Sequence, residues 1–485
     1  MTTTTPKRRV LGVFAALGLV TLLFACETSE TSEPKERETI DTDAGDTVDA
    51  PPPDAGVDAN DLDSAADDDF VVPDASVACG TGPCAVSITG HGDSFCVVLQ
   101  NGKMSCWGSN TSGQLGYDVD GGAFSATPQI LSGLAGVTSA SVGDGNTCAR
   151  VENGDVFCWG AAELVNAGVA DSDGGSSDPI TQPARVSAVP AAKSIAVGTG
   201  FACATASDGS LSCWGKNANR ELGRGSTSGT IEPPAKALLV AQAIATAVPG
   251  VGRTFAITPS GDLLSWGSGG MYGPDDWGRI KRLVQFLLGR DISDDPDGVP
   301  AIVPGLAGVR GIASSKVHAC AVVRRDVYCW GTNLRGQLGR GSFNPAPTTF
   351  QLPPSFLPEF SNLRFVADAD RKLAGELEKD VPIQVAVADE HSCAVMGSGR
   401  VYCWGKKGDA GVLGANAKED IIGTPTRIDG LSEPAVGIAS AASSVCALLR
   451  SGAVECWGSN GQGQLGTGTA DELPHPTPSR VALPN

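Results

Sequence analysis

The sequence predicts an all-β fold made of seven copies of one unit, and two observations lead to that prediction. A Trp-Gly pair recurs seven times, each time after an apolar stretch and a turn, and repeats of this period are typical of solenoids and propellers. The seven tryptophans are Trp107, Trp159, Trp214, Trp266, Trp330, Trp404 and Trp457. The composition agrees, because 63 glycines and 31 prolines among 485 residues, with only 5% aromatic residues, favour many short strands joined by tight turns.

The N-terminus has the pattern of an export signal. Basic residues 7–9 precede an apolar run over residues 10–24, which is shorter than the roughly 20 residues that a membrane-spanning helix needs. The run ends in "LFAC", whose cysteine is Cys26, and this stretch resembles the lipobox of bacterial lipoproteins. The resemblance implies that residues 1–25 are a cleaved signal peptide and that Cys26 carries the lipid anchor. The alternative is a signal anchor that is not cleaved.

The same resemblance predicts a place in the cell envelope. Glu27 stands where many bacterial lipoproteins retained at the inner membrane have an aspartate, so the outer membrane is favoured, and exposure on the cell surface stays open. The cysteine count is consistent with a lipid on Cys26, because 15 cysteines is an odd number and fourteen are left to pair with one another.

Residues 26–78 have the composition of a disordered acidic tether rich in Asp, Ala, Pro and Thr. Positions 27–78 contain 17 acidic and two basic residues, which is a net charge of −15 out of −19 for the whole chain. Because this stretch has few large apolar side chains, it buries too little surface to offset the entropy of ordering it. A flexible segment of this length spans roughly 40 Å, and repulsion between its like charges extends it further.

The seven units follow from residue 79 to residue 485, and two of them follow the pattern closely, the first more completely than the second. These are "KVHACAVVRRDVYCWGTNLRGQLGRG" (316–341) and "EHSCAVMGSGRVYCWG" (390–405). They resemble the regulator of chromosome condensation repeat, in which a His-x-Cys strand, a Trp-Gly strand and a Gly-Gln-Leu-Gly turn follow one another. The resemblance implies a seven-bladed β-propeller of four-stranded blades. Radial repetition is physically reasonable because it leaves only short, protected sheet edges.

Six cysteine pairs each flank a turn within one unit. They are Cys96–Cys106, Cys148–Cys158, Cys203–Cys213, Cys320–Cys329, Cys393–Cys403 and Cys446–Cys456. A spacing of ten places two cysteines opposite each other in a hairpin with an odd-numbered loop, such as three residues with a left-handed glycine. The pair at 320 and 329 has a spacing of nine and needs an even-numbered loop, and its turn "VRRD" has also lost the glycine. We expect six disulfides here and a seventh, Cys79–Cys84, at the entry to the repeats.

The unit around Trp266 supports disulfides over another role for these cysteines. Its equivalent positions are Phe255 and Ser265, so both cysteines are missing together, as paired residues predict. Opposed strand residues lie close enough to bridge, and each loop closed is worth about 2–3 kcal/mol. The alternative is zinc binding, but zinc ligands cluster at short spacing, and only Cys79 and Cys84 come near that.

The sequence predicts no catalytic, cofactor or metal site. His318 and His391 occupy the repeat's His-x-Cys position, where other units have Asn146, Phe201 or Ser444, so a hydrogen-bonding role at a strand end is favoured over catalysis. The other two histidines, at positions 91 and 475, are placed in turns. The carboxylates of "DISDDPDG" (291–298) lack the glutamate at the twelfth position of an EF-hand loop, which favours a solvated loop over a calcium site.

Two insertions, near residues 271–299 and 345–382, interrupt the repeat. In "WGRIKRLVQFLLGR" (277–290), apolar residues recur at helical spacing beside basic ones, which predicts a basic amphipathic helix. Such a helix could dock on a partner or a membrane surface, and the alternative is that its apolar stripe packs on its own blade. Its candidate partner-binding residues are Trp277, Lys281, Arg282, Phe286 and Arg290. The second insertion includes residues 367–380, a predicted surface helix.

These observations favour a non-catalytic, lipid-anchored propeller that binds an unknown protein or glycan partner as a monomer. A net charge of −19 argues against nucleic acid as the partner, since that role needs clustered Lys and Arg. One alternative is a hydrolase or lyase that uses the central channel. The other is guanine-nucleotide exchange, the activity of the founder of the repeat family, which acts on the small GTPase Ran. An exported protein would not meet that GTPase, and a shared fold does not imply a shared function.

Overall fold

The computed structural model describes residues 74–485 except 120–122, 169–177, 239, 241, 275–279, 285–286, 291, 293–295, 342–360 and 363–379. The expected signal peptide, Cys26 and most of the expected tether therefore lie outside the described residues. Among the described residues, no helix is both long and apolar enough to cross a membrane.

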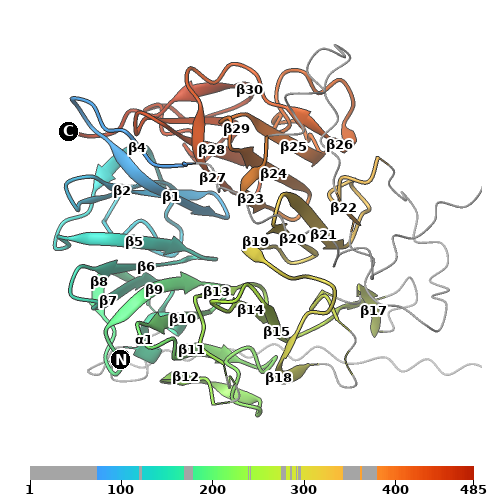
Figure 1. Cartoon of the computed structure of the whole chain (residues 1–485). Coiled ribbons are helices and arrows are strands. Elements are labelled where there is room, and N and C mark those ends of the chain that lie inside the picture. Colours follow the sequence, from blue (N-terminus) through green and yellow to red (C-terminus); the bar gives the residue numbers. More distant parts are fainter. Residues whose placement is uncertain are drawn as a thin grey trace, which may run out of the picture. The chain divides into compact units, whose positions relative to one another are not determined.

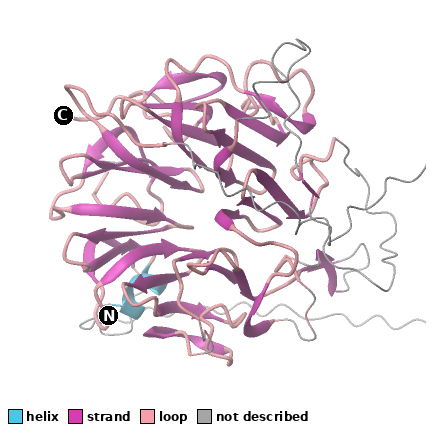
Figure 2. Cartoon of the chain, viewed as in Figure 1, coloured by secondary structure: helices cyan, strands magenta, loops and turns pink. Residues whose placement is uncertain are grey.

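Seven four-stranded antiparallel sheets succeed one another along the chain and confirm the predicted seven-bladed propeller. They are numbered blade 1 to blade 7 here, and in Figure 1 they run around a ring from blue to red. The four strands of each blade follow one another along the chain, apart from a hairpin inserted before the last strand of blade 4. No described blade therefore combines strands from the two ends of the chain. Figure 2 shows strands nearly throughout, beside the one helix of the described residues, α1 (Ala162–Gly168).

The strands have equivalent places in every blade. The first strands are β1 (Ala85–His91), β5 (Val137–Val142), β9 (Ala192–Val197), β13 (Thr246–Pro249), β19 (Val309–Ser314), β23 (Pro382–Val387) and β27 (Ala435–Ser440). The second strands are β2 (Ser94–Leu99), β6 (Asn146–Val151), β10 (Phe201–Ala206), β14 (Arg253–Ile257), β20 (His318–Val323), β24 (His391–Met396) and β28 (Ser444–Leu449). The third strands are β3 (Met104–Ser109), β7 (Val156–Gly160), β11 (Leu211–Asn217), β15 (Leu263–Gly267), β21 (Asp326–Gly331), β25 (Val401–Lys406) and β29 (Val454–Asn460). The fourth strands are β4 (Phe124–Ile130), β8 (Ile180–Arg185), β12 (Ser228–Lys236), β18 (Asp297–Ile302), β22 (Ser361–Asn362), β26 (Ile421–Arg427) and β30 (Asp471–Arg480).

The first strands contact one another around the ring, and β1 also contacts β27, so blades 1 and 7 are neighbours. Backbone hydrogen bonds also join these terminal blades. Ala442 N donates to Gly92 O at 2.6 Å, and Gly468 N donates to Ala126 O at 2.9 Å. The ring is thus closed by packing and hydrogen bonds between two complete blades.

The hydrophobic core consists of separate clusters between neighbouring blades, one for each junction in the described residues. Adjacent residues of one strand enter different clusters because side chains alternate across a sheet. Cys106 contributes to the cluster that blade 1 shares with blade 2, whereas Trp107 contributes to the one shared with blade 7. All seven repeat tryptophans are fully buried in this way.

All seven expected cysteine pairs are disulfide-bonded. The six pairs within blades join opposed residues of the second and third strands, with Cα atoms 4.0–4.1 Å apart, close to the short spacing of non-hydrogen-bonded pairs. Gly102 has a φ of +73° in its three-residue loop, as the spacing of ten predicts. In blade 5, Val323 pairs with Asp326 across a two-residue loop, and in blade 4 Phe255 pairs with Ser265 without a bridge.

The chain enters the propeller along the last blade. Ala78 N donates to Arg450 O at 2.7 Å, and Arg450 Nη2 donates to Asp74 O at 3.3 Å. Ala75 and Val77 pack against the cluster between blades 7 and 1. Contact with the propeller therefore begins by Asp74, five residues before the predicted boundary at Cys79, because the apolar Ala75 and Val77 pack against this cluster.

Candidate interaction face

The antiparallel topology gives the ring two different faces. The turns between first and second strands and the connections between third and fourth strands lie on one face, which we call the insertion face. The turns between second and third strands and the connections from blade to blade lie on the other, which we call the hairpin face. The first insertion lies between β15 and β18, so its described residues leave from the insertion face. The second insertion flanks β22, and its residues 345–360 and 363–379 lie outside the described residues.

A recurrent hydrogen bond fixes the loops of the insertion face to the next blade. The indole Nε1 of a repeat tryptophan donates to the backbone carbonyl of the residue before Leu-Gly in the glycine turn of the preceding blade, at 2.8–3.1 Å. The acceptors are Gln464 for Trp107, Gln114 for Trp159, Glu221 for Trp266, Leu287 for Trp330, Gln337 for Trp404 and Val412 for Trp457. These turns therefore form a rigid base for the connections that follow them.

Trp214 is the exception among the described residues. Its Nε1 is buried without a hydrogen-bond partner. In the preceding blade, α1 follows β7 where other blades have the glycine turn, and its Leu164 and Val165 pack in the cluster that contains Trp214. The helix fills the space with apolar side chains but offers the indole no carbonyl.

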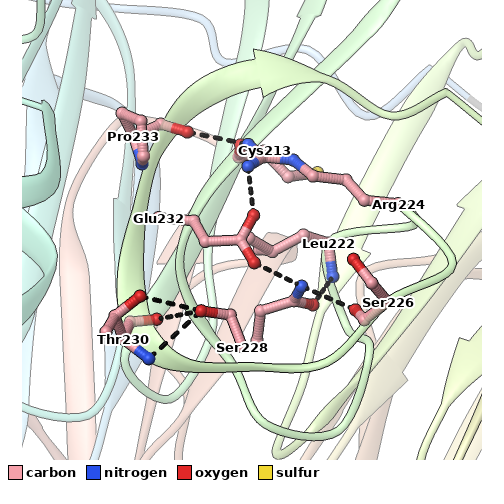
Figure 3. Close-up of polar contacts among 9 residues, drawn as sticks. Cys213, Leu222, Arg224, Ser226, Ser228, Thr230, Glu232 and Pro233 are labelled. Carbon is pink, nitrogen blue, oxygen red and sulfur yellow. Dashed lines mark hydrogen bonds and ion pairs between the residues drawn. The ribbon is translucent and has the colours of Figure 1, made fainter.

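In blades 1, 3 and 4, the residue after Leu-Gly reaches back to the carbonyl that precedes the repeat tryptophan. Tyr117 Oη donates to Cys106 O at 2.8 Å, and burial raises the pKa of this phenol to about 12. Arg224 Nη2 donates to Cys213 O at 2.6 Å, and its guanidinium pairs with Glu232 and also reaches Pro233 O (Figure 3). These side chains hold the start of the fourth strand against the third.

Arg290 has this structural role in blade 4, so its assignment to a partner surface is wrong. Its side chain is buried, with Nη2 donating to Ser265 O at 2.9 Å and to Val299 O at 3.1 Å, and Nη1 pairing with Asp297 at 2.8 Å. Leu287 and Leu288 beside it are buried as well. Residues 287–290 are the glycine turn of blade 4, displaced along the chain by the insertion.

The predicted helix over residues 277–290 is also wrong. The insertion contains a two-stranded antiparallel hairpin of β16 (Met271–Pro274) and β17 (Ile280–Val284), followed by the turn at 287–290. Lys281 and Arg282 belong to β17, whereas Trp277 and Phe286 lie outside the described residues. The helical spacing arose because the leucines of the blade's own turn directly follow an apolar strand. The alternative reading, in which the apolar stripe packs on its own blade, is correct for those leucines.

The predicted helix over residues 367–380 lies outside the described residues except for Asp380. Its carboxylate accepts hydrogen bonds from the backbone and hydroxyl of Ser398 at 2.8 and 2.5 Å. This residue thus fixes the hairpin turn of blade 6.

A cleft of about 350 Å³ opens on the insertion face between blades 6 and 7. Blade 6 contributes Glu390, His391 and the loop 406–412 after β25. Blade 7 contributes its first turn and the start of β30, residues 472–474. Sequence reasoning did not find this cleft, because its walls come from stretches more than 60 residues apart.

A local departure from the repeat marks the blade 6 wall. In blade 1, the side-chain oxygen of Asn110 accepts the backbone N–H of Leu115 and closes the glycine turn, and blades 3, 5 and 7 have the same contact. Blade 6 has Lys407 instead, and its turn is one residue longer, with Val412 N bonding to Lys407 O at 3.1 Å. The extra residue before Leu413 is the signal in the sequence that sets this turn apart from the Gly-Gln-Leu-Gly turns of blades 1, 5 and 7.

The histidines at the repeat's His-x-Cys position are buried hydrogen-bonding groups, as the sequence predicts. His318 Nε2 lies 2.7 Å from Ser392 Oγ, and His391 Nε2 lies 2.7 Å from Ser440 Oγ, each in the next blade. Burial lowers the pKa of His318 to about 3 and that of His391 to about 4, and for His318 the nearby His391 adds to the effect.

The other titratable groups form no metal site among the described residues. His91 ends β1 and its pKa is lowered by burial, whereas His475 lies within β30 with Nε2 2.8 Å from Asp471 Oδ1, so neither lies in the expected turn. Of the carboxylates at 291–298, Asp297 pairs with Arg290, while residues 291 and 293–295 lie outside the described residues.

Comparison with known proteins agrees with the repeat assignment. A family model of the regulator of chromosome condensation (RCC1) repeat matches residues 137–162 and 383–410, and a second model of this repeat matches residues 398–448. The solved structure of Prp20p from Saccharomyces cerevisiae has a TM-score of 0.60 at 18% identity and covers 84% of this chain and 88% of that one. Human WBSCR16 has a TM-score of 0.61 at 19% identity over 79% and 95% of the two chains. These likenesses show the fold.

Three curated relatives have different activities. The ultraviolet-B receptor UVR8 of Arabidopsis thaliana is 28% identical over 70% of this chain and 80% of its own. The secretion-regulating guanine nucleotide exchange factor of Bos taurus is 26% identical over 53% of this chain and 58% of its own. The E3 ubiquitin-protein ligase HERC2 of Mus musculus is 25% identical over 78% of this chain but only 7% of its own length.

Proposed function

Since the chain is a seven-bladed propeller that carries RCC1 repeats, we propose that it is a non-catalytic scaffold that binds a protein or glycan partner. Its anchor is a lipid on Cys26, and residues 27–73 extend it from the outer membrane. The partner contact lies on the insertion face. This function agrees with relatives that include a receptor, because a rigid ring with variable loops suits recognition.

One observation carries this proposal: the segment that enters the propeller and the first insertion are on opposite faces. The entry segment runs to the hairpin turn of blade 7, where Ala85 N donates to Gly452 O at 2.8 Å and Cys84 packs against Ser451. That turn belongs to the hairpin face. A tether attached there leaves the insertion face free for a partner.

The β16–β17 hairpin is the element of this face that most needs a partner. Its two strands pair with each other in a sheet of their own. A two-stranded hairpin is marginally stable in water unless another surface covers it. Its sequence includes Tyr272, Lys281 and Arg282, residue types common at protein interfaces or beside anionic groups.

Site-specific photo-crosslinking in the native cell envelope tests the contact. A photoreactive residue at Tyr272 or Leu473 on the insertion face should give adducts of defined mass, and the same residue at Asn101 or Ser207 on the hairpin face should not. Adducts from the hairpin-face positions alone, or from none of the four, would contradict the proposal. Leu473, Asn101 and Ser207 are all exposed to solvent.

The anchor has a separate test by intact mass of the protein extracted without reductant. We expect a mass that begins at Cys26, carries acyl chains and lacks two hydrogens for each of the seven disulfides. An unprocessed, reduced chain would contradict the exported location.

A second candidate function is guanine-nucleotide exchange, favoured by the similarity to the Bos taurus exchange factor. The purified protein would then accelerate release of a fluorescent guanine nucleotide from a small GTPase such as Ran. We expect no acceleration over the spontaneous rate, and an acceleration of tenfold or more would replace the scaffold proposal.

A further inference from the structure

The cleft between blades 6 and 7 has walls of different character. One wall is the long turn after β25, with Lys406, Lys407 and Asp409. The facing wall is the start of β30, where Glu472 and Leu473 are exposed. The cleft floor includes the buried His391. A side chain entering the cleft would therefore pass between two elements whose backbones are fixed by the blades.

The basic groups of the cleft already have partners. Lys406 Nζ lies 3.0 Å from Glu390 Oε2, and Glu390 also lies 3.4 Å from Arg335 Nε. Lys407 Nζ donates to Ala417 O at 2.9 Å. The cleft therefore offers little that would attract an anion, since each cation is held by an oxygen of the protein.

The two remaining carboxylates do not have such partners among the described residues. Neither Asp409 nor Glu472 has an ion pair or a hydrogen bond to its carboxylate there, and each is exposed at the edge of the cleft. They belong to facing walls, one from each blade. A cation placed between them would complete the charge balance of the cleft, because its lining has three acidic and two basic side chains.

An apolar surface adjoins these carboxylates. Leu473 is 67% exposed, and Pro474 beside it is exposed as well. Lysine and arginine cover apolar surface with their aliphatic stems while keeping the charged head in a polar environment. A carboxylate pair beside an exposed leucine therefore suits such a side chain better than it suits a metal ion.

The geometry points to this cleft as the docking site for a lysine or arginine side chain of a protein partner, with the charged head between Asp409 and Glu472 and the stem on Leu473. This inference rests on the proposed use of the insertion face for binding and specifies the partner as a protein with an exposed basic residue. Charge-assisted hydrogen bonds to the two carboxylates supply the attraction.

Peptide binding to the full-length protein in detergent tests the inference. The probe is acetyl-Gly-Arg-Gly-amide, and the comparator contains citrulline, which has nearly the same shape without the charge. Saturation-transfer NMR with titration should show binding of the arginine peptide, at least tenfold weaker binding of the citrulline peptide, and loss of the difference at high salt.

Two double variants separate the cleft from the general charge of the face. Asp409→Asn with Glu472→Gln should weaken the arginine peptide at least fivefold. The control, Asp118→Asn with Glu419→Gln, removes the same charge from exposed positions of this face outside the cleft and should leave the affinity unchanged. Equal thermal unfolding of the two variants shows that the fold is intact.

Several results would overturn the inference. These are equal binding of both peptides, no binding of either at 10 mM, or full affinity in the cleft variant. Spermidine that binds as tightly as the peptide would assign the cleft to small amines instead of a protein side chain. The crosslinking test is independent, so a cleft that binds arginine without any insertion-face adduct would contradict the scaffold function and leave the binding site standing.

Discussion

The indole nitrogen of Trp107 donates a hydrogen bond to the backbone carbonyl of Gln464, at 2.9 Å across 357 positions of the sequence. The contact joins blade 1 to blade 7 and is the same one that joins five other pairs of neighbouring blades. The ring thus closes with the interaction that already recurs inside it. The structure needs no exchange of strands between the chain ends, because the repeat supplies a donor and an acceptor at this junction as it does at five others.

Replacing the indole by a phenyl ring should separate the hydrogen bond from the packing. We expect Trp107→Phe to lower the free energy of unfolding by about 1 kcal/mol more than Trp214→Phe, because only Trp107 has an acceptor to lose. Both changes reduce the buried volume equally. Denaturant unfolding with the disulfides intact measures the difference, and equal losses would show that the recurrent bond adds nothing to stability.

The glycine turn at the ring closure should not accept a side chain. Gly466 has a φ of +64°, and a Cβ there would lie 2.9 Å from Val481 Cγ1 and 3.0 Å from Trp107 Nε1. We expect Gly466→Ala to cost about 2–4 kcal/mol, from the left-handed backbone and the overpacking together. Gly468→Ala is the control, since its φ is +90° but its Cβ meets only Thr127 Oγ1 at 3.8 Å. Similar thermal shifts in both variants would attribute the whole cost to the backbone.

The buried histidines predict a loss of stability on acidification. Their folded-state pKa values, about 3 for His318 and about 4 for His391, lie below the ordinary value of 6.5. The unfolded chain therefore binds protons first, so stability is full above pH 6.5 and falls as the pH decreases towards 4, by a few kcal/mol in total. His391→Asn should flatten that slope, because asparagine occupies the equivalent position 146 of blade 2. A slope unchanged in the variant would assign the acid sensitivity to other groups.

Most of the fold could be predicted because every unit repeats the same pairing of its second and third strands. The spacing of the cysteines gave the register of the second and third strands, and the single spacing of nine gave the two-residue loop at Arg324 and Arg325. The absence of both cysteines at the positions of Phe255 and Ser265 identified the blade without a disulfide. Such inferences succeed because they compare equivalent positions within one chain and depend on local geometry alone.

The insertions were harder to predict because they lie outside that comparison. The leucines at 287 and 288 belong to the turn of blade 4, but the insertion separated them from their tryptophan and made them resemble one face of a helix. The cleft was missed for a different reason. Asp409 and Glu472 line one cleft only because blades 6 and 7 pack side by side, and no short-range spacing in the sequence records that packing.

Arg290 offers the sharpest test of how the first insertion is divided between structure and function. We expect Arg290→Ala to cost about 2–3 kcal/mol, because it leaves Asp297 unpaired and removes donors from the carbonyls of Ser265 and Val299. Arg224→Ala should cost a similar amount, since that side chain holds blade 3 in the same way.

The control for Arg290 is Arg282→Ala, which removes the same charge from β17 of the same insertion. We expect Arg282→Ala to change the free energy of unfolding by less than about 0.5 kcal/mol, because β17 pairs only with β16 and belongs to no blade, while its effect on partner crosslinking at Tyr272 should be the larger of the two. A protein that tolerates Arg290→Ala without loss of stability would return that residue to the partner surface. The opposite result fixes the boundary of the functional part of the insertion before Leu287, because every residue from there to Arg290 then serves the blade.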